Sequence, residues 1–269
     1  MSVTTIAVRY VREIVAGWPP EPKQNLLLEL LRLLGRWRSQ MLSNTFVSME
    51  GGARIWGGPF AGMEYVHEAT EGALIPRLLG TYECELHPHL TALAAEGLDT
   101  IIDVGCAEGY YAVGLARMMP GVQVHAHDID ERARLACTDL AARNGLSDRV
   151  IVGGEFRPQD FNAFAGRRVL VMVDAEGAEL DILQPDLGPA LADMNIIVET
   201  HDLFRRGALA TLMERFGATH DIVRVDSGPK VLQGPDWLLG LAQLDQLLAV
   251  WEWRSAATPW LVMRPKART

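Results

Sequence analysis

The chain has 269 residues, of which 49% are hydrophobic and 22% are charged, and its formal net charge is −9. This composition indicates a globular protein with a full core and excludes an intrinsically disordered chain. The acidic balance, with no block of Lys or Arg, argues against a nucleic-acid partner held by phosphate contacts.

The N-terminal 45 residues show a helical pattern that prolines interrupt between residues 18 and 22. The run NLLLELLRLLGRW that follows is apolar around much of a helix but is too short to span a bilayer. We expect a helix over residues 24–37 whose leucines are buried against the rest of the chain or a second copy of it, because exposing them would leave a large apolar patch. Burial against a second copy would form a homodimer through the N-terminal helices.

A glycine-rich connection follows, and residues 71–96 have a helical pattern. From Thr100 onward, short apolar runs alternate with helical segments of roughly ten to fifteen residues. The runs are TIIDV, VQVHAHD, RVIVGG, RVLVMVD, NIIVET, HDIVRV and PWLVMR. This pattern predicts an α/β fold: a Rossmann-like seven-stranded sheet, mostly parallel, with helices on both faces and an antiparallel last strand. We divide the chain into an N-terminal helical extension with its glycine-rich connection, residues 1–70, and an α/β domain, residues 71–269.

The loop after the first strand has the composition of a nucleotide-binding turn. Asp103 closes the strand, Gly105 allows a tight turn, and Gly109 allows the backbone to approach a ligand closely where a helix begins. Ala107 stands where the Gly-x-Gly-x-x-Gly fingerprint of nicotinamide enzymes needs glycine. The loop resembles instead the first motif of class I methyltransferases, which implies that Asp103 lies near the methionine portion of S-adenosylmethionine.

Acidic residues also follow the second and third strands. Asp128 lies beyond the carboxyl end of its strand, where a carboxylate can accept hydrogen bonds from both ribose hydroxyls of a nucleotide. Asp130 suits the N-cap of the next helix better. Glu155 is placed to meet the adenine amino group, with Phe156 beside the ring, and a plain surface charge is the alternative for Glu155.

The ends of the fourth and fifth strands carry a more specific resemblance. They read VMVDAEGAELDIL over residues 171–183 and IIVETHD over residues 196–202. Both are similar to FkbM-type methyltransferases, whose fourth strand typically ends in Asp-x-Glu-Gly-x-Glu and whose fifth ends in Glu followed by His. The resemblance covers roughly residues 79–219. It implies an S-adenosylmethionine-dependent enzyme that methylates a hydroxyl of a small molecule or a sugar-bearing natural product.

Three residues at these strand ends are the candidate catalytic groups: Asp174, Glu199 and His201. They are expected at one sheet edge, because ligands of open parallel sheets bind beyond the carboxyl ends of the strands. We expect a neutral His201, its tautomer fixed by Glu199, to take the acceptor's proton, with Asp174 as the next candidate. Substrate contact and a structural role are the alternatives for His201. Glu179 is expected to face the dipole of the helix that it begins.

The same strand ends raise the question of a metal. Hard oxygen ligands from Asp174 and from Glu199 or Asp202 would suit Mg²⁺. Carboxylates near helix starts are common without a metal, and we expect a reaction that needs none.

The expected function is methyl transfer from S-adenosylmethionine to a small-molecule substrate. Two other classes stay open: a non-catalytic methyltransferase-like partner subunit, and a nicotinamide-dependent oxidoreductase, which the glycine spacing disfavours. Cys84, Cys106 and Cys137 lack metal-site spacing and favour free thiols in a reducing compartment. We therefore expect a cytoplasmic protein without a membrane span.

Overall fold

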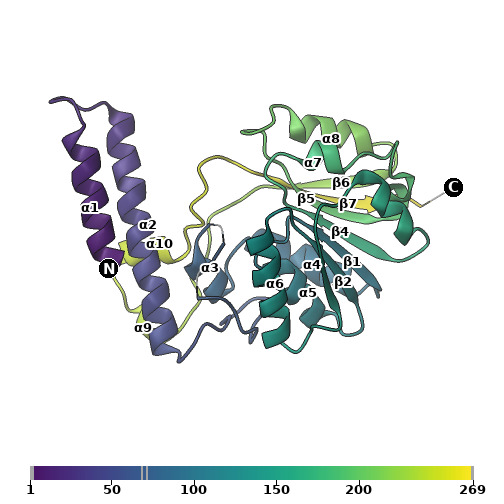
Figure 1. The fold of residues 1–269 in the computed structure, drawn as a ribbon, viewed down its shortest axis with the longest axis horizontal. Helices are drawn as coiled ribbons and strands as arrows, with labels where there is room; N and C mark the ends of the chain where they lie inside the picture. Colours follow the sequence, from purple (N-terminus) through teal and green to yellow (C-terminus); the bar gives the residue numbers. More distant parts are fainter. Residues whose placement is uncertain (1–2, 68, 71, 268–269) are drawn as a thin grey trace.

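A computed structural model describes residues 3–67, 69–70 and 72–267. Within them, one seven-stranded sheet has the order β3-β2-β1-β4-β5-β7-β6 (Figure 1). The first five strands of the chain pair in parallel, and β7 pairs antiparallel with both β5 and β6. The strands are β1 (Thr100–Val104), β2 (Gln123–His127), β3 (Val150–Gly153), β4 (Val169–Val173), β5 (Asn195–Glu199), β6 (His220–Val225) and β7 (Trp260–Pro265). The predicted Rossmann-like sheet and its antiparallel last strand are confirmed.

The sheet is buried on both faces, as its near-continuous apolar strands require. Successive side chains of β1 serve different layers: Ile101 belongs to one core cluster and Ile102 to the other. Figure 1 shows α4, α5 and α6 on one side of the sheet and α7 and α8 on the other. These helices and the 3₁₀ turns between strands are α4 (His87–Ala94), α5 (Tyr110–Met118), α6 (Glu131–Arg143), η2 (Pro158–Phe164), α7 (Glu179–Ile182), η3 (Pro189–Asp193) and α8 (Ala208–Phe216).

The helical pattern of residues 71–96 corresponds to three short helical elements within the described residues. Position 71 lies outside the described residues, and α3 (Leu74–Leu79) ends at Gly80, whose φ is +73°. A Cβ on Gly80 would lie 2.0 Å from the carbonyl oxygen of Gly57, so only glycine fits this crossing. The chain turns again at Glu83 before η1 (Cys84–Leu86) and α4.

The N-terminal segment forms the two helices that the proline break predicts, α1 (Val3–Ala16) and α2 (Gln24–Met49). Figure 1 shows them beside the sheet, together with α9 (Asp236–Leu239) and α10 (Gln243–Ala249). Arg38 of α2 donates two hydrogen bonds of 2.7 Å to Asp245 of α10. The N-terminal helix α2 is therefore tied to a segment some 200 positions later in the chain.

Four of the seven leucines of the α2 run are exposed and the other three are partly buried, which contradicts the full burial expected for them within the chain. Their exposed fractions lie between 41% and 65% for Leu27, Leu28, Leu31 and Leu34. The buried positions of α2 begin only at Gly35. Burial against a second copy of the chain stays a prediction. No helix in the described part of the chain is long and apolar enough to cross a membrane.

Candidate functional site

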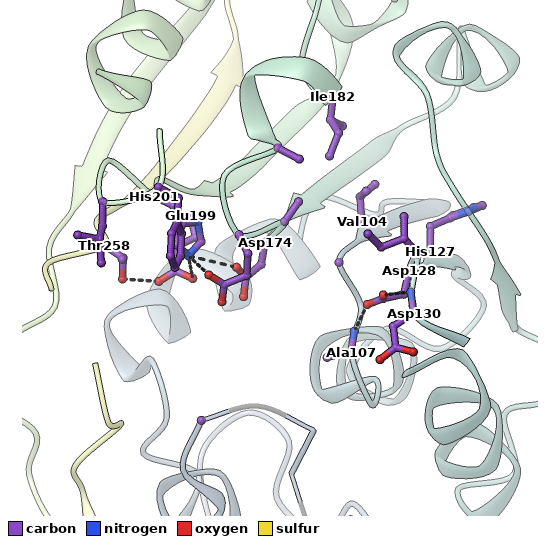
Figure 2. Close-up of a pocket in the computed structure, with 18 of the residues that line it drawn as sticks. Val104, Ala107, His127, Asp128, Asp130, Asp174, Ile182, Glu199, His201 and Thr258 are labelled. Atoms are coloured by element: carbon purple, nitrogen blue, oxygen red, sulfur yellow. Dashed lines mark hydrogen bonds and ion pairs between the residues drawn. The ribbon is translucent and has the colours of Figure 1, made fainter. Parts of the chain in front are cut away.

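A cavity of about 890 Å³ lies at the carboxyl edge of the parallel strands. Figure 2 shows two separate groups of polar side chains in it, one around Asp128 and one around His201. This is the edge at which open parallel sheets bind their ligands. Of the residues predicted for the site, those that line the cavity are Gly105, Asp128, Glu155, Asp174, Glu199 and His201.

The two glycines of the loop after β1 have different roles. Gly105 has a φ of +87°, and a Cβ there would lie 1.7 Å from the carbonyl oxygen of Asp174, so the turn requires glycine. At Gly109 an added Cβ would instead meet the Cys137 sulfur at 2.9 Å. This glycine, with a φ of +97°, lets α5 pack closely against α6, and it is not among the residues that line the cavity, so its role with a cofactor stays a prediction.

Asp128 is fixed by backbone amides. Its Oδ2 accepts a hydrogen bond of 3.0 Å from Ala107 N, and its Oδ1 accepts one of 2.8 Å from Asp130 N (Figure 2). Asp130 accepts a hydrogen bond from Arg132 N and caps α6, as predicted. The carboxylate of Asp128 is thus oriented at the cavity wall, and each oxygen keeps a lone pair for a further donor.

The neighbouring wall combines apolar and charged side chains. Ile129 is 84% exposed although it lines the cavity, an unusual position for a large apolar residue. Phe156 is buried beside it with its ring against His127. Glu155 lines the cavity, but its side chain is exposed and pairs with Arg157 at 2.8 Å. This exposed ion pair does not fix the carboxylate toward the cavity. Its role with adenine stays a prediction.

Asp103 lies behind the loop and lines a separate small cavity next to Tyr110. It is 3% exposed, and its Oδ2 has no hydrogen-bond partner among the described residues. Burial and then the charge of Asp128 raise its pKa to about 7.

His201 is the centre of the second group. Its Nδ1 lies 2.7 Å from Glu179 Oε1, and that carboxylate is fully buried. Its Nε2 faces Glu199 and Glu176 at 3.5 Å and Asp174 at 3.7 Å. Glu179, and not Glu199, therefore orients the imidazole. Glu179 also lies in the first turn of α7, where a helix-start charge is expected, and its carboxylate accepts a hydrogen bond from Gly177 N.

The carboxylates decide the charge of the imidazole. Burial would lower the pKa of His201, but the contacts with Glu179, Glu199 and Asp174 outweigh it and raise that pKa to about 11. Burial likewise opposes the charge of Glu199, yet His201 and Arg254 lower its pKa to about 2. Burial and the charge of Glu199 raise the pKa of Asp174 well above its usual range. The neutral His201 expected from the sequence is thus an imidazolium in this arrangement.

Several residues of the site gave no recognisable signal in the sequence. Arg254, in the segment before β7, pairs with Glu199, with Glu83 and, at 2.9 Å, with Glu252. Thr258 donates a hydrogen bond of 2.6 Å to Glu199 (Figure 2). Both residues lie after the stretch 79–219 that carries the family resemblance, so no motif marked them. Asp202, weighed as a metal ligand, accepts hydrogen bonds from the turn before α8.

The comparisons with known proteins give the fold. No family model matches the chain. It is 34% identical over 131 residues to a "Ribosomal protein L11 methyltransferase" of Vibrio cholerae and 33% identical over 135 residues to one of Pasteurella multocida. These matches cover 46% and 47% of this chain, but 42% and 44% of the relatives, so the chain spans less than half of their length.

Among solved structures, the O-methyltransferase from Bacillus cereus in complex with SAH is similar with a TM-score of 0.50 and 11% identity. The alignment covers 98% of this chain and 100% of that one. The chain therefore has the class I methyltransferase fold.

Proposed function

We propose that this chain is an S-adenosylmethionine-dependent methyltransferase of the FkbM type, which methylates a hydroxyl of a small molecule or sugar-bearing natural product. The observation that carries the proposal is the content of one cavity: the Gly105 loop and Asp128 at one end, and the Asp174–Glu199–His201 cluster at the other. The 34% identity over 131 residues with an L11 methyltransferase supports methyl transfer. Three free cysteines support the cytoplasmic location that we include in it.

The cofactor end of the cavity fits an adenosine. Asp128 would accept the ribose hydroxyls, since amides already hold it in place. Ile129 is exposed in the cavity wall and would be covered by the adenine face. When bound, S-adenosylmethionine supplies an electrophilic methyl group.

The other end of the cavity would hold the acceptor. Asp174, Glu199 and His201 are proposed to bind its hydroxyl. The imidazolium of His201 would donate a hydrogen bond to the oxygen, and a carboxylate of the cluster would receive the proton that methylation releases. Leu203 and Phe204 line the same cavity and are 62% and 63% exposed, which suits an acceptor with an apolar part. A volume of about 890 Å³ is near the upper end of the range for small-molecule sites and leaves room for both ligands.

Calorimetry tests the cofactor assignment. We expect S-adenosylmethionine and its demethylated product to bind at micromolar concentrations and NAD not to bind. Asp128→Asn should weaken this binding about ten-fold or more, because two hydrogen bonds to a charged acceptor are impaired. Asp130→Asn is the matched control, since asparagine is an equally good N-cap and should leave binding unchanged.

The same titrations separate the alternatives. Binding of NAD without S-adenosylmethionine would favour the nicotinamide oxidoreductase, and binding of neither would favour the non-catalytic partner subunit. Equal affinities of the Asp128→Asn variant and the wild type would remove Asp128 from the site.

A protein acceptor is the second candidate, because the curated relatives are named as methyltransferases of a ribosomal protein. Incubation with radiolabelled S-adenosylmethionine, a panel of hydroxylated small molecules and a ribosomal-protein fraction distinguishes the two. Label in the small-molecule pool is expected, and label confined to protein would overturn the small-molecule assignment.

A further inference from the structure

His201 points its free ring nitrogen into a ring of carboxylates. Its side chain is only 5% exposed, and Nε2 lies 3.7 Å from Asp174 Oδ1 (Figure 2). The same nitrogen lies 3.5 Å from Glu176 Oε2. These separations are long for hydrogen bonds. Two ligands that share a cation at about 2.1 Å lie at most about 4.2 Å apart, so both separations suit neighbouring metal ligands.

The other ring nitrogen is held in the way that metal-binding histidines are held. Glu179, with no exposed surface, contacts Nδ1 at 2.7 Å, and its Oε1 also accepts a hydrogen bond of 2.9 Å from Gly177 N. A carboxylate that accepts a hydrogen bond from Nδ1–H leaves Nε2 directed at Asp174 and Glu176, where a bound cation would displace the proton of this nitrogen.

The surroundings of Asp174 are a second observation that favours a bound cation. Asp174 Oδ1 is shielded from solvent and has no hydrogen-bond partner among the described residues. Within the same part of the chain, no Lys or Arg forms an ion pair with Asp174 or Glu176, while Arg254 is engaged with other acids. A buried carboxylate oxygen without a donor is costly, and a cation bound to it would remove that cost.

We propose that Asp174, Glu176 and His201 bind a divalent cation of the first transition series, with Mn²⁺ as its representative. One imidazole nitrogen with carboxylate oxygens favours such an ion over Mg²⁺, which prefers oxygen ligands alone. The three ligand atoms lie within 4.8 Å of one another. This replaces the metal-free site expected from the sequence, and it replaces Glu199 and Asp202 as ligands by Glu176 and His201.

The cation site is inferred from the geometry of its ligands alone. Its use in methyl transfer rests on the proposed function. A cation at the acceptor end would coordinate the acceptor's hydroxyl oxygen and favour its deprotonated form, and Glu199, which also lines the cavity and is not a ligand, would receive the proton. Glu179 is then a positioning residue for the ligand His201.

The test is titration of the apo protein with MnCl₂, followed by electron paramagnetic resonance of the free ion and by calorimetry. We expect one site per chain and a Kd in the micromolar range. Glu176→Gln should weaken binding at least ten-fold, and Glu179→Gln by about 10- to 100-fold. Asp181→Asn is the matched control: this acid also lines the cavity and is exposed, but it pairs with Arg205 and should leave affinity unchanged.

His201 is buried, so His201→Ala can destabilise the fold. Glu176 is half-exposed, so Glu176→Gln should fold normally and tests the site by itself. Absence of binding up to millimolar Mn²⁺, or equal affinities of Glu176→Gln and the wild type, would overturn the site. S-adenosylmethionine is titrated separately without metal. Binding of that cofactor with no binding of Mn²⁺ refutes the metal site alone, and the reverse result refutes the proposed function alone.

Discussion

Asp103 couples the stability of the fold to pH. Its pKa is about 7 in the folded chain, against an ordinary 3.8, because the carboxyl is buried near Asp128. The folded state therefore holds this proton more tightly than the unfolded state. The favourable contribution is complete below about pH 4, falls as pH rises through the window to about 7, and is then lost.

We predict that Asp103→Asn removes this dependence. The variant should be more stable than the wild type at pH 8, by at most about 4 kcal/mol for a three-unit shift, and the difference should shrink toward pH 4. Urea unfolding of both proteins between pH 4 and 8 measures it. A difference that is constant over this range would show that Asp103 keeps an ordinary pKa.

Gly105 provides a second prediction at this scale, with Gly121 as its internal control. Both have φ near +90°, but an added Cβ meets the Asp174 carbonyl oxygen at 1.7 Å in one case and nothing within 4 Å in the other. Gly121→Ala should cost only the left-handed strain of about 1–2 kcal/mol. Gly105→Ala should cost about 3 kcal/mol more, because backbone must move. Chemical denaturation compares them, and equal costs would mean that the turn has another shape.

At the scale of elements, the strands and their chemistry follow from the sequence for a physical reason. A central parallel strand is buried on both faces, so VLVMV of β4 reads as a continuous apolar run that ends where the chain leaves the core. The residue after that end must reach the carboxyl edge, which is how Asp174 and Asp128 could be placed beforehand. Asp130 could be predicted as an N-cap because it directly precedes the helical pattern that begins at Glu131.

Other features depend on contacts that no local pattern encodes. Glu179 is the helix-start charge that the sequence indicates, but only the tertiary fold brings it to His201, 22 positions later in the chain. Arg254 reaches Glu199 across 55 positions of sequence from an irregular segment. The helical pattern before β1 is divided into short elements, because the close approach of Gly80 to Gly57 ends α3. This approach is a tertiary contact that the local pattern does not encode.

At the scale of the whole molecule, the exposed leucines of α2 suggest how copies of the chain meet. We predict a homodimer in solution, in which Leu31 packs against the partner's helices. Leu31→Glu should shift the mass measured by light scattering toward the monomer and leave the melting temperature of the monomer unchanged. Leu135→Glu on α6 is the control, because Leu135 has the same exposed fraction of 65%.

A monomeric wild type, or equal effects of the two substitutions, would contradict the dimer.

The division of the chain between residues 70 and 71 also stays a prediction at this scale. Limited proteolysis between them would test it.

The tie between α2 and α10 also has a consequence for synthesis on the ribosome. The bond from Arg38 to Asp245 joins an early and a late segment, so α2, which also contacts α1 and α3, leaves the ribosome almost 200 residues before α10 is made. At 5–20 residues per second, this wait lasts roughly 10–40 s. During it the leucine face of α2 is available to chaperones. Arg254, needed for the charge balance of the cavity, emerges later still, so the nascent chain cannot assemble its site until synthesis is nearly finished.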